Sequence, residues 1–351
     1  MRSVALDAMG GDRAPVAEVE AALQIVRENI AEVALVGDEP RLKSELNRLG
    51  AKTPPTGLTL HHAPDVIAMD DHPALAAKGK KNSSMRVAFD LVQSGQAEAV
   101  VSAGNSGAML ACGLLVLKRI RGLDRPAILT TFPTVKEVCA LLDMGANVEC
   151  KPQNLAQFAV LGATFARLRH GKSRPKVALL SNGSEASKGT ELTRAAHALL
   201  SACTVAEPDF QYCGYVEGHE LFSGDLDVVV TDGFTGNIVL KTAEGASAAA
   251  FQLLRKEILA TRTGQLGGRI LKGTFQNLKK KLDYDEHGGA PLVGVSGVAV
   301  ICHGRSSVKA IKNGVQVAVG LVNVGLQAAI ASAFAKHAPL WEKLPAQSPA
   351  K

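Results

Sequence analysis

Residues 99–108 read Ala-Val-Val-Ser-Ala-Gly-Asn-Ser-Gly-Ala. The first four residues make an apolar run of strand length, and the Ala- and Leu-rich segment that follows Gly107 is typical of a helix. Two glycines, Gly104 and Gly107, flank the point at which the strand would turn into the helix. A buried strand that ends in a glycine-containing turn and leads directly into a helix indicates an α/β protein.

The same pattern recurs along the 351 residues. Continuous apolar strands that alternate with helices indicate a mostly parallel sheet covered on both faces. We therefore predict an α/β fold, a three-layer α/β/α sandwich. The expected strands lie at 3–6, 33–36, 58–61, 99–102, 138–142, 176–180, 227–231 and 298–302.

One segment, residues 236–282, interrupts this alternation. Its pattern predicts a long helix, a break at Gly264 and Gly267-Gly268, and a second helix, which together would form a helical hairpin projecting from the sheet. No linker divides the remainder, so we expect one α/β domain over 1–338 and a frayed tail over 339–351. Residues 314–334 predict a buried helix rather than a membrane span.

The composition narrows the class of function. Aromatic residues are 4% of the chain, which argues against a nucleic-acid-binding protein that stacks aromatic side chains on bases. The net charge of +6 is compatible with an acidic protein partner, an anionic membrane surface or a phosphate-bearing substrate. The six cysteines lack zinc-type spacing, and the first residues show no leader pattern. We expect a cytoplasmic protein without a metal or other cofactor.

In an open α/β sheet, ligands bind beyond the carboxyl ends of the strands, so the turns that follow strands form the candidate site. The turn at 104–107 has the strongest signal, because backbone N–H groups at a helix start can cradle an anion of phosphate size. The alternative is an ordinary helix cap by Asn105 or Ser106. Gly104 and Gly107 flank the cap, which favours the anion site.

Other turns contribute candidate side chains. The turn after 228–230 offers Asp232 and Asn237, with Lys241 one helical turn further along. A lysine run places Lys81 and Asn82 at a helix start, although such a run is usually a solvated face. The remaining candidates, each with a plain structural role as the alternative, are Asp7, Gly10, Gly11, Asp12, Asp143, Lys188 and His303.

Motifs that would indicate nucleotide chemistry are missing from the sequence. No Gly-x-Gly-x-x-Gly follows the first strand, and residues 166–173 lack the first glycine of a P-loop. No Gly-x-Ser-x-Gly nucleophile elbow occurs either. The sequence therefore offers phosphate-type turns without a nucleotide motif.

Six motifs together resemble the phosphate acyltransferase (PlsX) family, and the resemblance extends to about residue 330. It implies transfer of a fatty acyl group from acyl carrier protein to inorganic phosphate, which gives acyl phosphate for phosphatidic acid and phospholipid synthesis. It also implies a homodimer with a phosphotransacetylase-like fold. Ser184 and Gly79 depart from the family's usual residues. The motifs are Asp-Ala-Met-Gly-Gly-Asp-x-Ala-Pro (7–15), Lys-Asn-Ser-Ser-Met (81–85), Ser-Ala-Gly-Asn-Ser-Gly-Ala (102–108), Leu-Asp-Met-Gly-Ala-Asn-Val (142–148), Lys-Gly-Thr-Glu-Leu (188–192) and Val-Val-Thr-Asp-Gly-Phe-Thr-Gly-Asn (229–237).

The reaction itself assigns expected roles. Phosphate is anionic at neutral pH and a thiol departs readily as thiolate, so an enzyme must chiefly fix phosphate and supply donors to the tetrahedral oxyanion. We expect the phosphate to be bound by 105–107 with Lys81 or Lys241, the carbonyl to be polarised by Asn82 or Asn237, and the donors to be oriented by Asp143 or Asp232.

Three other functions stay open on the sequence alone. A phosphotransacetylase that uses acyl-CoA would share the fold and the turns, and a decarboxylating dehydrogenase would need a nicotinamide site and a divalent metal. A non-catalytic membrane-bound scaffold for lipid enzymes is the third. A further partner that fits the resemblance is the downstream glycerol-phosphate acyltransferase.

The expected apex of the hairpin is both apolar and basic. Apolar residues ringed by cations suit shallow insertion into an anionic membrane, so we expect peripheral association with the inner face of the cell membrane. The alternative is that these apolar residues pack in a dimer interface. The apolar residues are Leu259, Leu266, Ile270 and Leu271, and the cations are Arg255, Lys256, Arg262, Arg269 and Lys272.

Overall fold

The computed structural model describes residues 1–342 except 186, 207–208 and 283–287. Its core is one 11-stranded sheet with the strand order β3-β2-β1-β4-β11-β10-β5-β6-β9-β7-β8. The strands are β1 Ser3–Asp7, β2 Glu32–Gly37, β3 Leu58–His62, β4 Ala99–Ser102, β5 Ala127–Pro133, β6 Val138–Leu142, β7 Lys176–Leu180, β8 Gln211–Val216, β9 Val228–Val230, β10 Ala290–Val293 and β11 Val298–Ile301.

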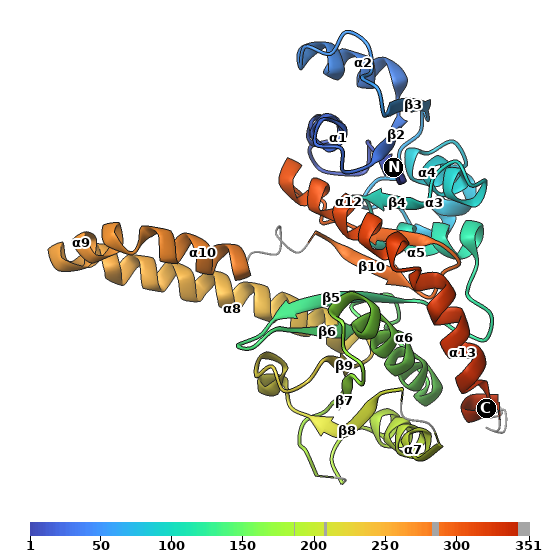
Figure 1. Ribbon diagram of the computed structural model, residues 1–351, viewed down its shortest axis with the longest axis vertical. Helices are drawn as coiled ribbons and strands as arrows, with labels where there is room; N and C mark the ends of the chain where they lie inside the picture. Colours follow the sequence, from blue (N-terminus) through green and yellow to red (C-terminus); the bar gives the residue numbers. More distant parts are fainter. Residues whose placement is uncertain (186, 207–208, 283–287, 343–351) are drawn as a thin grey trace.

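Helices cover both faces of this sheet, as Figure 1 shows. The strand β4 illustrates why, since Ala99 and Val101 pack in one hydrophobic core and Val100 packs in the other. The α/β class and the mostly parallel sheet are therefore confirmed. The helices of the body are α1 Val16–Arg27, α2 Glu39–Arg48, α3 Pro73–Gly79, α4 Ser84–Gln93, α5 Ser106–Cys112, α6 Pro152–His170, α7 Glu191–Ala206, α12 Val308–Asn323 and α13 Leu326–Glu342, with a π-helix η1 at Gly113–Leu117 and a 3-10 helix η2 at Gly218–Phe222.

The sheet consists of two parallel halves that run in opposite directions. The first half is β3-β2-β1-β4-β11 and the second half is β6-β9-β7-β8. Three antiparallel pairings, β11 with β10, β10 with β5, and β5 with β6, lie between them. Because three antiparallel pairings separate the two halves, the carboxyl ends of the strands in one half point in the opposite direction to those in the other half.

The hairpin projects from the body as a long arm in Figure 1. It consists of α8 Gly233–Ala260, α9 Arg262–Ile270 and α10 Lys272–Leu282. The expected break at Gly264 and Gly267-Gly268 is wrong, because these glycines lie inside α9. The chain breaks at Thr261, where the threonine hydroxyl accepts a hydrogen bond from the Gly264 amide at 3.0 Å and so caps α9.

The C-terminal apolar segment forms two helices, α12 and α13, instead of the single buried helix expected over 314–334. No single described helix is long and apolar enough to cross a membrane. The two helices Val308–Asn323 and Leu326–Ala338, which are bent by 53° relative to each other, reach that length and apolar composition when taken together. The α12 side chains Ile311, Val315 and Leu321 are buried in the protein core. The helix α13 continues to Glu342, and the rest of the expected frayed tail lies outside the described residues.

Candidate active site

The turns of the first half of the sheet meet in one group, which we call the first turn group: 7–12, 102–107 and 303–304. Register pairs Asp7 of β1 with Ser102 of β4, and the Ser102 hydroxyl donates a hydrogen bond to the Asp7 carboxylate at 2.6 Å. A Cβ on Gly10 would lie only 2.9 Å from the Gly104 backbone, so glycine is required for this close approach. The Asp12 amide donates to the Gly304 carbonyl at 2.8 Å, which brings the His303–Gly304 turn into the same group.

Two buried carboxyl groups lie beneath this turn group. Asp7 is fully buried, and desolvation raises the pKa of its carboxyl although Ser102 and backbone amides donate to it. Glu18 of α1 is 1% exposed, and burial raises the pKa of its carboxyl to about 7. Its Oε2 atom has no hydrogen-bond partner in the described structure. The first turn group therefore rests on acidic groups that burial holds towards the protonated state.

The anion-cradle turn is held in place by its own side chains. The Asn105 side chain accepts from the Ala108 amide at 3.1 Å and donates to the Met69 carbonyl at 3.0 Å. The Gly104 amide donates to the Ser102 hydroxyl at 3.0 Å. The amides of Asn105, Ser106 and Gly107 donate no hydrogen bond within the described residues. These three amides are thus the donors left for an anion, while Gly104 and the Asn105 side chain shape the turn.

Within the motif at 81–85, only Ser84 and Met85 contact the first turn group. Ser84 is buried and donates to the Asp7 carboxyl, and the Met85 side chain would contact any Cβ on Gly104 at 2.7 Å. Lys81 and Asn82 are exposed, and their side chains make no hydrogen bond within the described residues. Their expected roles toward substrate stay predictions.

The second half of the sheet brings together another set of turns, the second turn group: 143–147 and 231–237. The Asp143 amide donates to the Thr231 carbonyl at 3.0 Å, and the Gly233 amide donates to the Asn147 carbonyl at 2.8 Å. A Cβ on Gly236 would lie 1.9 Å from the Asp143 carbonyl oxygen, so only glycine allows α8 to begin against this turn. The family-like motifs 142–148 and 229–237 are therefore one structural unit.

The two aspartates of the second turn group are fully engaged. Asp143 is buried, and its carboxylate accepts from the amides of Ile128, Ala146 and Asn147 and from the Asn147 side chain, at 2.6–3.1 Å. Desolvation raises the pKa of Asp143 against these hydrogen bonds. Asp232 caps α8 by accepting from the Thr235 amide at 2.9 Å and hydroxyl at 2.8 Å. Such fully occupied carboxylates fit the expected orienting role better than a nucleophilic one.

The other candidates of the second half lie at the edges of its turns. Asn237 is exposed and packs beside Gly145, whose positive φ of 116° favours glycine. Lys241 pairs with Glu244 at 2.9 Å, and no hydrogen bond or ion pair joins it to 104–107. Lys188 is exposed in the turn after β7. Among the described residues no hydrogen bond links the first turn group with the second, so the sequence-predicted residues form two sets.

A pocket of about 490 Å³ lies between the α5–η1 segment and the second turn group. Arg119 and Arg125 line it, although neither was a candidate from the sequence. Burial raises the pKa of the nearby Cys150 thiol to about 12, and the positive charge of Arg125 acts in the opposite direction. Four cations within eight residues, 118–125, were the signal in the sequence that could have identified this wall. The lining residues are Leu110, Leu114, Arg119, Asp124, Arg125, Pro126, Ala146 and Asn147.

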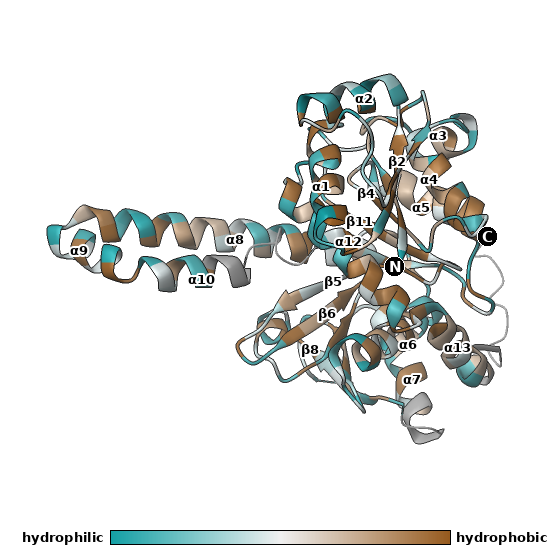
Figure 2. Ribbon diagram, turned by 45° about the horizontal axis from the view of Figure 1, so that its top comes forward, coloured by the Kyte–Doolittle hydropathy of each residue, from teal (hydrophilic) through white to brown (hydrophobic). Residues whose placement is uncertain are grey.

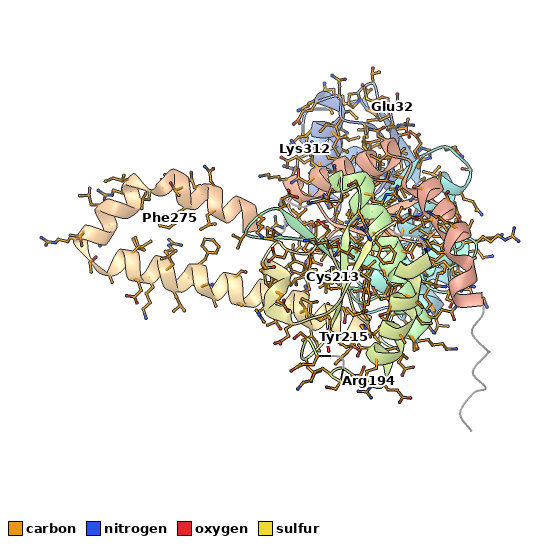
Figure 3. The ribbon with its side chains drawn as sticks, turned by 60° about the horizontal axis from the view of Figure 1, so that its bottom comes forward. Glu32, Arg194, Cys213, Tyr215, Phe275 and Lys312 are labelled. Atoms are coloured by element: carbon orange, nitrogen blue, oxygen red, sulfur yellow. The ribbon has the colours of Figure 1, made fainter. Side chains whose placement is uncertain are left out.

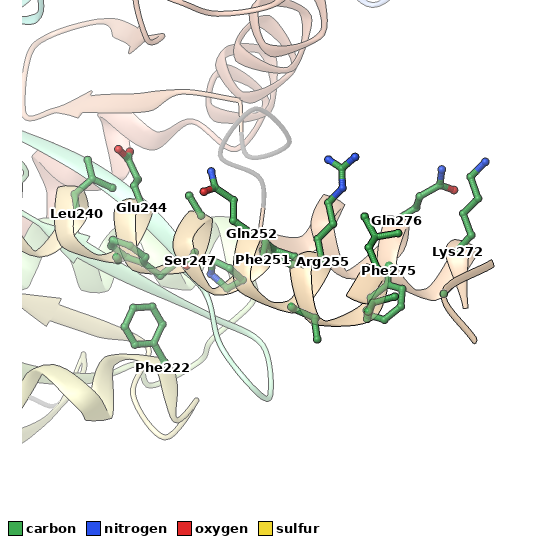
Figure 4. A pocket seen from close by; sticks show the side chains of 18 of the residues that line it. Phe222, Leu240, Glu244, Ser247, Phe251, Gln252, Arg255, Lys272, Phe275 and Gln276 are labelled. Carbon is green, nitrogen blue, oxygen red and sulfur yellow. The ribbon is translucent and has the colours of Figure 1, made fainter. Parts of the chain in front are cut away.

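A larger apolar groove of about 1150 Å³ runs from β5 and Phe222 along the hairpin. Figure 4 shows side chains of α8 and α10 along this groove, and Figure 3 shows Phe275 between α8 and α10. The hairpin tip is exposed and, coloured by hydropathy in Figure 2, mixes apolar with polar residues. The exposed fractions of the expected membrane residues are 52% for Leu259, 61% for Leu266, 76% for Ile270 and 47% for Leu271.

Known structures share this architecture. A phosphotransacetylase from Streptococcus pyogenes superimposes with a TM-score of 0.62 at 18% identity, covering 95% of this chain and 94% of that chain. The EutD phosphotransacetylase from Staphylococcus aureus gives a TM-score of 0.59 at 18% identity, covering 91% and 93%. The chain is thus an α/β protein with the phosphotransacetylase fold.

Sequence relatives define the class further. The chain matches the family described as "Fatty acid synthesis protein" over residues 2–329. It is 51% identical over 328 residues to the phosphate acyltransferase of Geobacter sulfurreducens, covering 93% of each chain. It is 48% identical over 340 residues to that of Myxococcus xanthus, covering 95% of this chain and 94% of the relative. The chain belongs to the phosphate acyltransferase family, and it is an acyltransferase.

Proposed function

We propose that this protein transfers a fatty acyl group from acyl carrier protein to inorganic phosphate, giving acyl phosphate for phosphatidic acid and phospholipid synthesis. Membership of the phosphate acyltransferase family supports acyl transfer to phosphate. The observation that carries the proposal is the set of amides at 105–107, which donate no hydrogen bond within the described residues and are held by a turn that the Asn105 and Ser102 side chains fix. The carrier-protein donor rests on the resemblance of the six motifs.

The reaction needs few groups from the protein. A phosphate oxygen attacks the thioester carbonyl carbon, the tetrahedral oxyanion collapses, and the C–S bond breaks with the sulfur leaving as thiolate. A thiol of ordinary pKa, about 8.5, is a good leaving group, so no strong general acid is required. The amides at 105–107 would fix the phosphate, and Asn82 or Asn237 would donate to the oxyanion, where one donor is worth ~3 kcal/mol.

A product assay tests this function. Purified protein is incubated with acyl carrier thioester and radiolabelled phosphate, and labelled acyl phosphate is measured together with free thiol. We expect both products to depend on phosphate and to form in equal amounts. Thiol release without phosphate would indicate a hydrolase, and no release would favour the non-catalytic scaffold; either result would overturn the proposal.

We also propose a homodimer that uses the hairpin. Within the 28 residues of α8 only Gly233 and Gly236 are buried, and the apolar side chains of Leu253 and Leu254 are 62% and 41% exposed. Isolated helices gain little stability in water without a packed apolar face. A second copy laid along the groove of about 1150 Å³ would cover this face.

The exposed residues of the hairpin tip support the proposal that this is a cytoplasmic protein associated peripherally with the inner face of the cell membrane. Four exposed apolar side chains at the tip lie beside Arg262, Arg269 and Lys272, which are also exposed. Cations near an anionic surface contribute ~1 kcal/mol each to binding. A membrane-bound glycerol-phosphate acyltransferase would be the natural recipient of a reactive acyl phosphate released there.

A further inference from the structure

A basic segment connects η1 with β5. Lys118, Arg119, Arg121 and Arg125 are all exposed, and Asp124 is the one acid among residues 118–125. Just before them, Leu114 and Leu115 of η1 are 36% and 47% exposed. Exposed apolar side chains surrounded by charged ones resemble the core and rim of a protein-protein interface.

This basic segment is firmly anchored to the body. Ile120 and Leu123 alternate with the cations and are 5% and 4% exposed. The Ile120 amide donates to the Gly294 carbonyl at 3.0 Å, and the Lys118 carbonyl accepts from the Ser296 amide at 2.9 Å. The buried Gln157 accepts from the Asp124 amide at 3.0 Å. A partner would therefore meet a preorganised surface, which lowers the entropic cost of binding.

The backbone at the start of the segment is unusual. The helix before it is a π-helix, a form found frequently at functional sites. Lys118 itself has φ 65° and ψ 172°, a region in which residues other than glycine are rarely found. This conformation turns the chain from η1 into the basic segment, so that Leu114 and Arg119 both line the pocket of about 490 Å³.

We propose that residues 118–125, with Leu114 and Leu115, form the docking surface for the acidic carrier protein, and that the adjoining pocket admits its thioester-bearing arm. This inference rests on the proposed function. A carrier protein fits because the surface is basic, and because the pocket beside it leads between α5 and the second turn group. Within the segment the Arg119 guanidinium donates to the Asp124 carbonyl, whereas Lys80, another cation of the first half, forms an ion pair with Asp71 at 2.5 Å.

A membrane fits this surface less well than a protein. The hairpin, which carries the proposed membrane-contacting tip, projects from one side of the body in Figures 1 and 2, and α5 lies on the other side. Because η1 continues directly from α5, the basic segment belongs to the side away from the hairpin. A carrier protein could therefore dock there while the tip contacts lipid.

Charge reversal tests the docking surface. Arg121→Glu changes an exposed cation that does not line the pocket, and Lys52→Glu in the loop between α2 and β3 is a matched control elsewhere on the surface. Turnover is measured with acyl carrier thioester and with acyl-CoA, which lacks the carrier protein. We expect Arg121→Glu to lower kcat/KM for the carrier substrate about tenfold and to leave acyl-CoA turnover and the melting temperature unchanged, because like charges across an interface repel. The control should change neither substrate.

Other outcomes would overturn the proposal. An equal loss with both donors would assign the basic segment to phosphate binding, and an unchanged carrier KM with weaker binding to anionic vesicles would assign it to the membrane. An unchanged KM with unchanged vesicle binding would remove any docking role. Failure of the proposed function is separate and appears first, as a wild-type protein that does not use the carrier substrate at all.

Discussion

Glu18 is the residue whose burial has the clearest consequence for stability. Its carboxyl has a pKa of about 7 in the folded protein, above the ordinary value near 4.5. The stability that it contributes is complete below the unfolded pKa and is lost as pH rises through the folded pKa, because the unfolded state ionises first. We predict that Glu18→Gln removes this loss, so that the variant gains up to ~3 kcal/mol over wild type at pH 8 relative to pH 4.

Urea unfolding at several pH values measures this difference. Because other groups titrate equally in both proteins, the gap between the two curves isolates Glu18. Parallel curves between pH 4 and pH 8 would mean that Glu18 is ionised in the folded protein, and the account of this buried carboxyl would then be wrong.

The phosphate cradle depends on two side chains, Asn105 and Ser106. Ser106 is exposed and its hydroxyl has no structural hydrogen bond among the described residues, so the hydroxyl can donate to a phosphate held by the backbone amides. Ser106→Ala should therefore raise the KM for phosphate several-fold without lowering stability. Asn105→Ala should also lower stability, by about 1 kcal/mol, because Asn105 caps α5. Phosphate kinetics and thermal unfolding separate the two effects, with Ser44→Ala, an exposed serine on α2, as control. Wild-type kinetics in both variants would rule out the cradle.

The hairpin is the element that carries the membrane prediction. Leu266→Glu and Ile270→Glu place carboxylates at an exposed tip, where they would be repelled by anionic headgroups and lose apolar contact. We expect vesicle co-sedimentation to fall strongly while the dimer and the turnover of soluble substrate persist. Val135→Glu alters a residue that is 87% exposed in the turn between β5 and β6, and serves as control. Loss of the dimer in the tip variants would instead place these side chains in the subunit interface.

Most elements of the sheet could be predicted from local sequence, but the central antiparallel strands could not. Runs such as 99–102 and 176–180 are continuously apolar because parallel strands are buried on both faces. The antiparallel strands β5 and β10 were missed, and so was β8, a parallel strand at the edge of the sheet. β10 is only four residues long and contains Pro291, and β5 ends with Thr130, Thr131 and Pro133 in place of an apolar run. The hairpin was predicted correctly, but its break was placed at glycines although the Thr261 cap determines it.

The order of the strands in the sheet decides which turns lie close enough to act together. The sequence showed which turns follow strands, and five of the six family-like motifs do lie in the first or second turn group or contact one of them. It could not show that the sheet reverses between β11 and β6, because pairings between distant strands leave no local signal. For the same reason Arg119 and Arg125 drew no attention, since only the fold brings them to a pocket beside Ala146 and Asn147.

A comparison of acyl donors with one preparation of the protein tests the identity of the donor. Acyl carrier thioester and acyl-CoA of the same chain length are supplied separately with phosphate, and kcat/KM for acyl phosphate formation is measured for each. The proposed function predicts a clear preference for the carrier thioester, and a preference that declines as salt rises because the partner is acidic. Equal or better use of acyl-CoA would instead identify an acyl-CoA-dependent phosphotransacylase, and the proposed carrier-protein donor would be wrong.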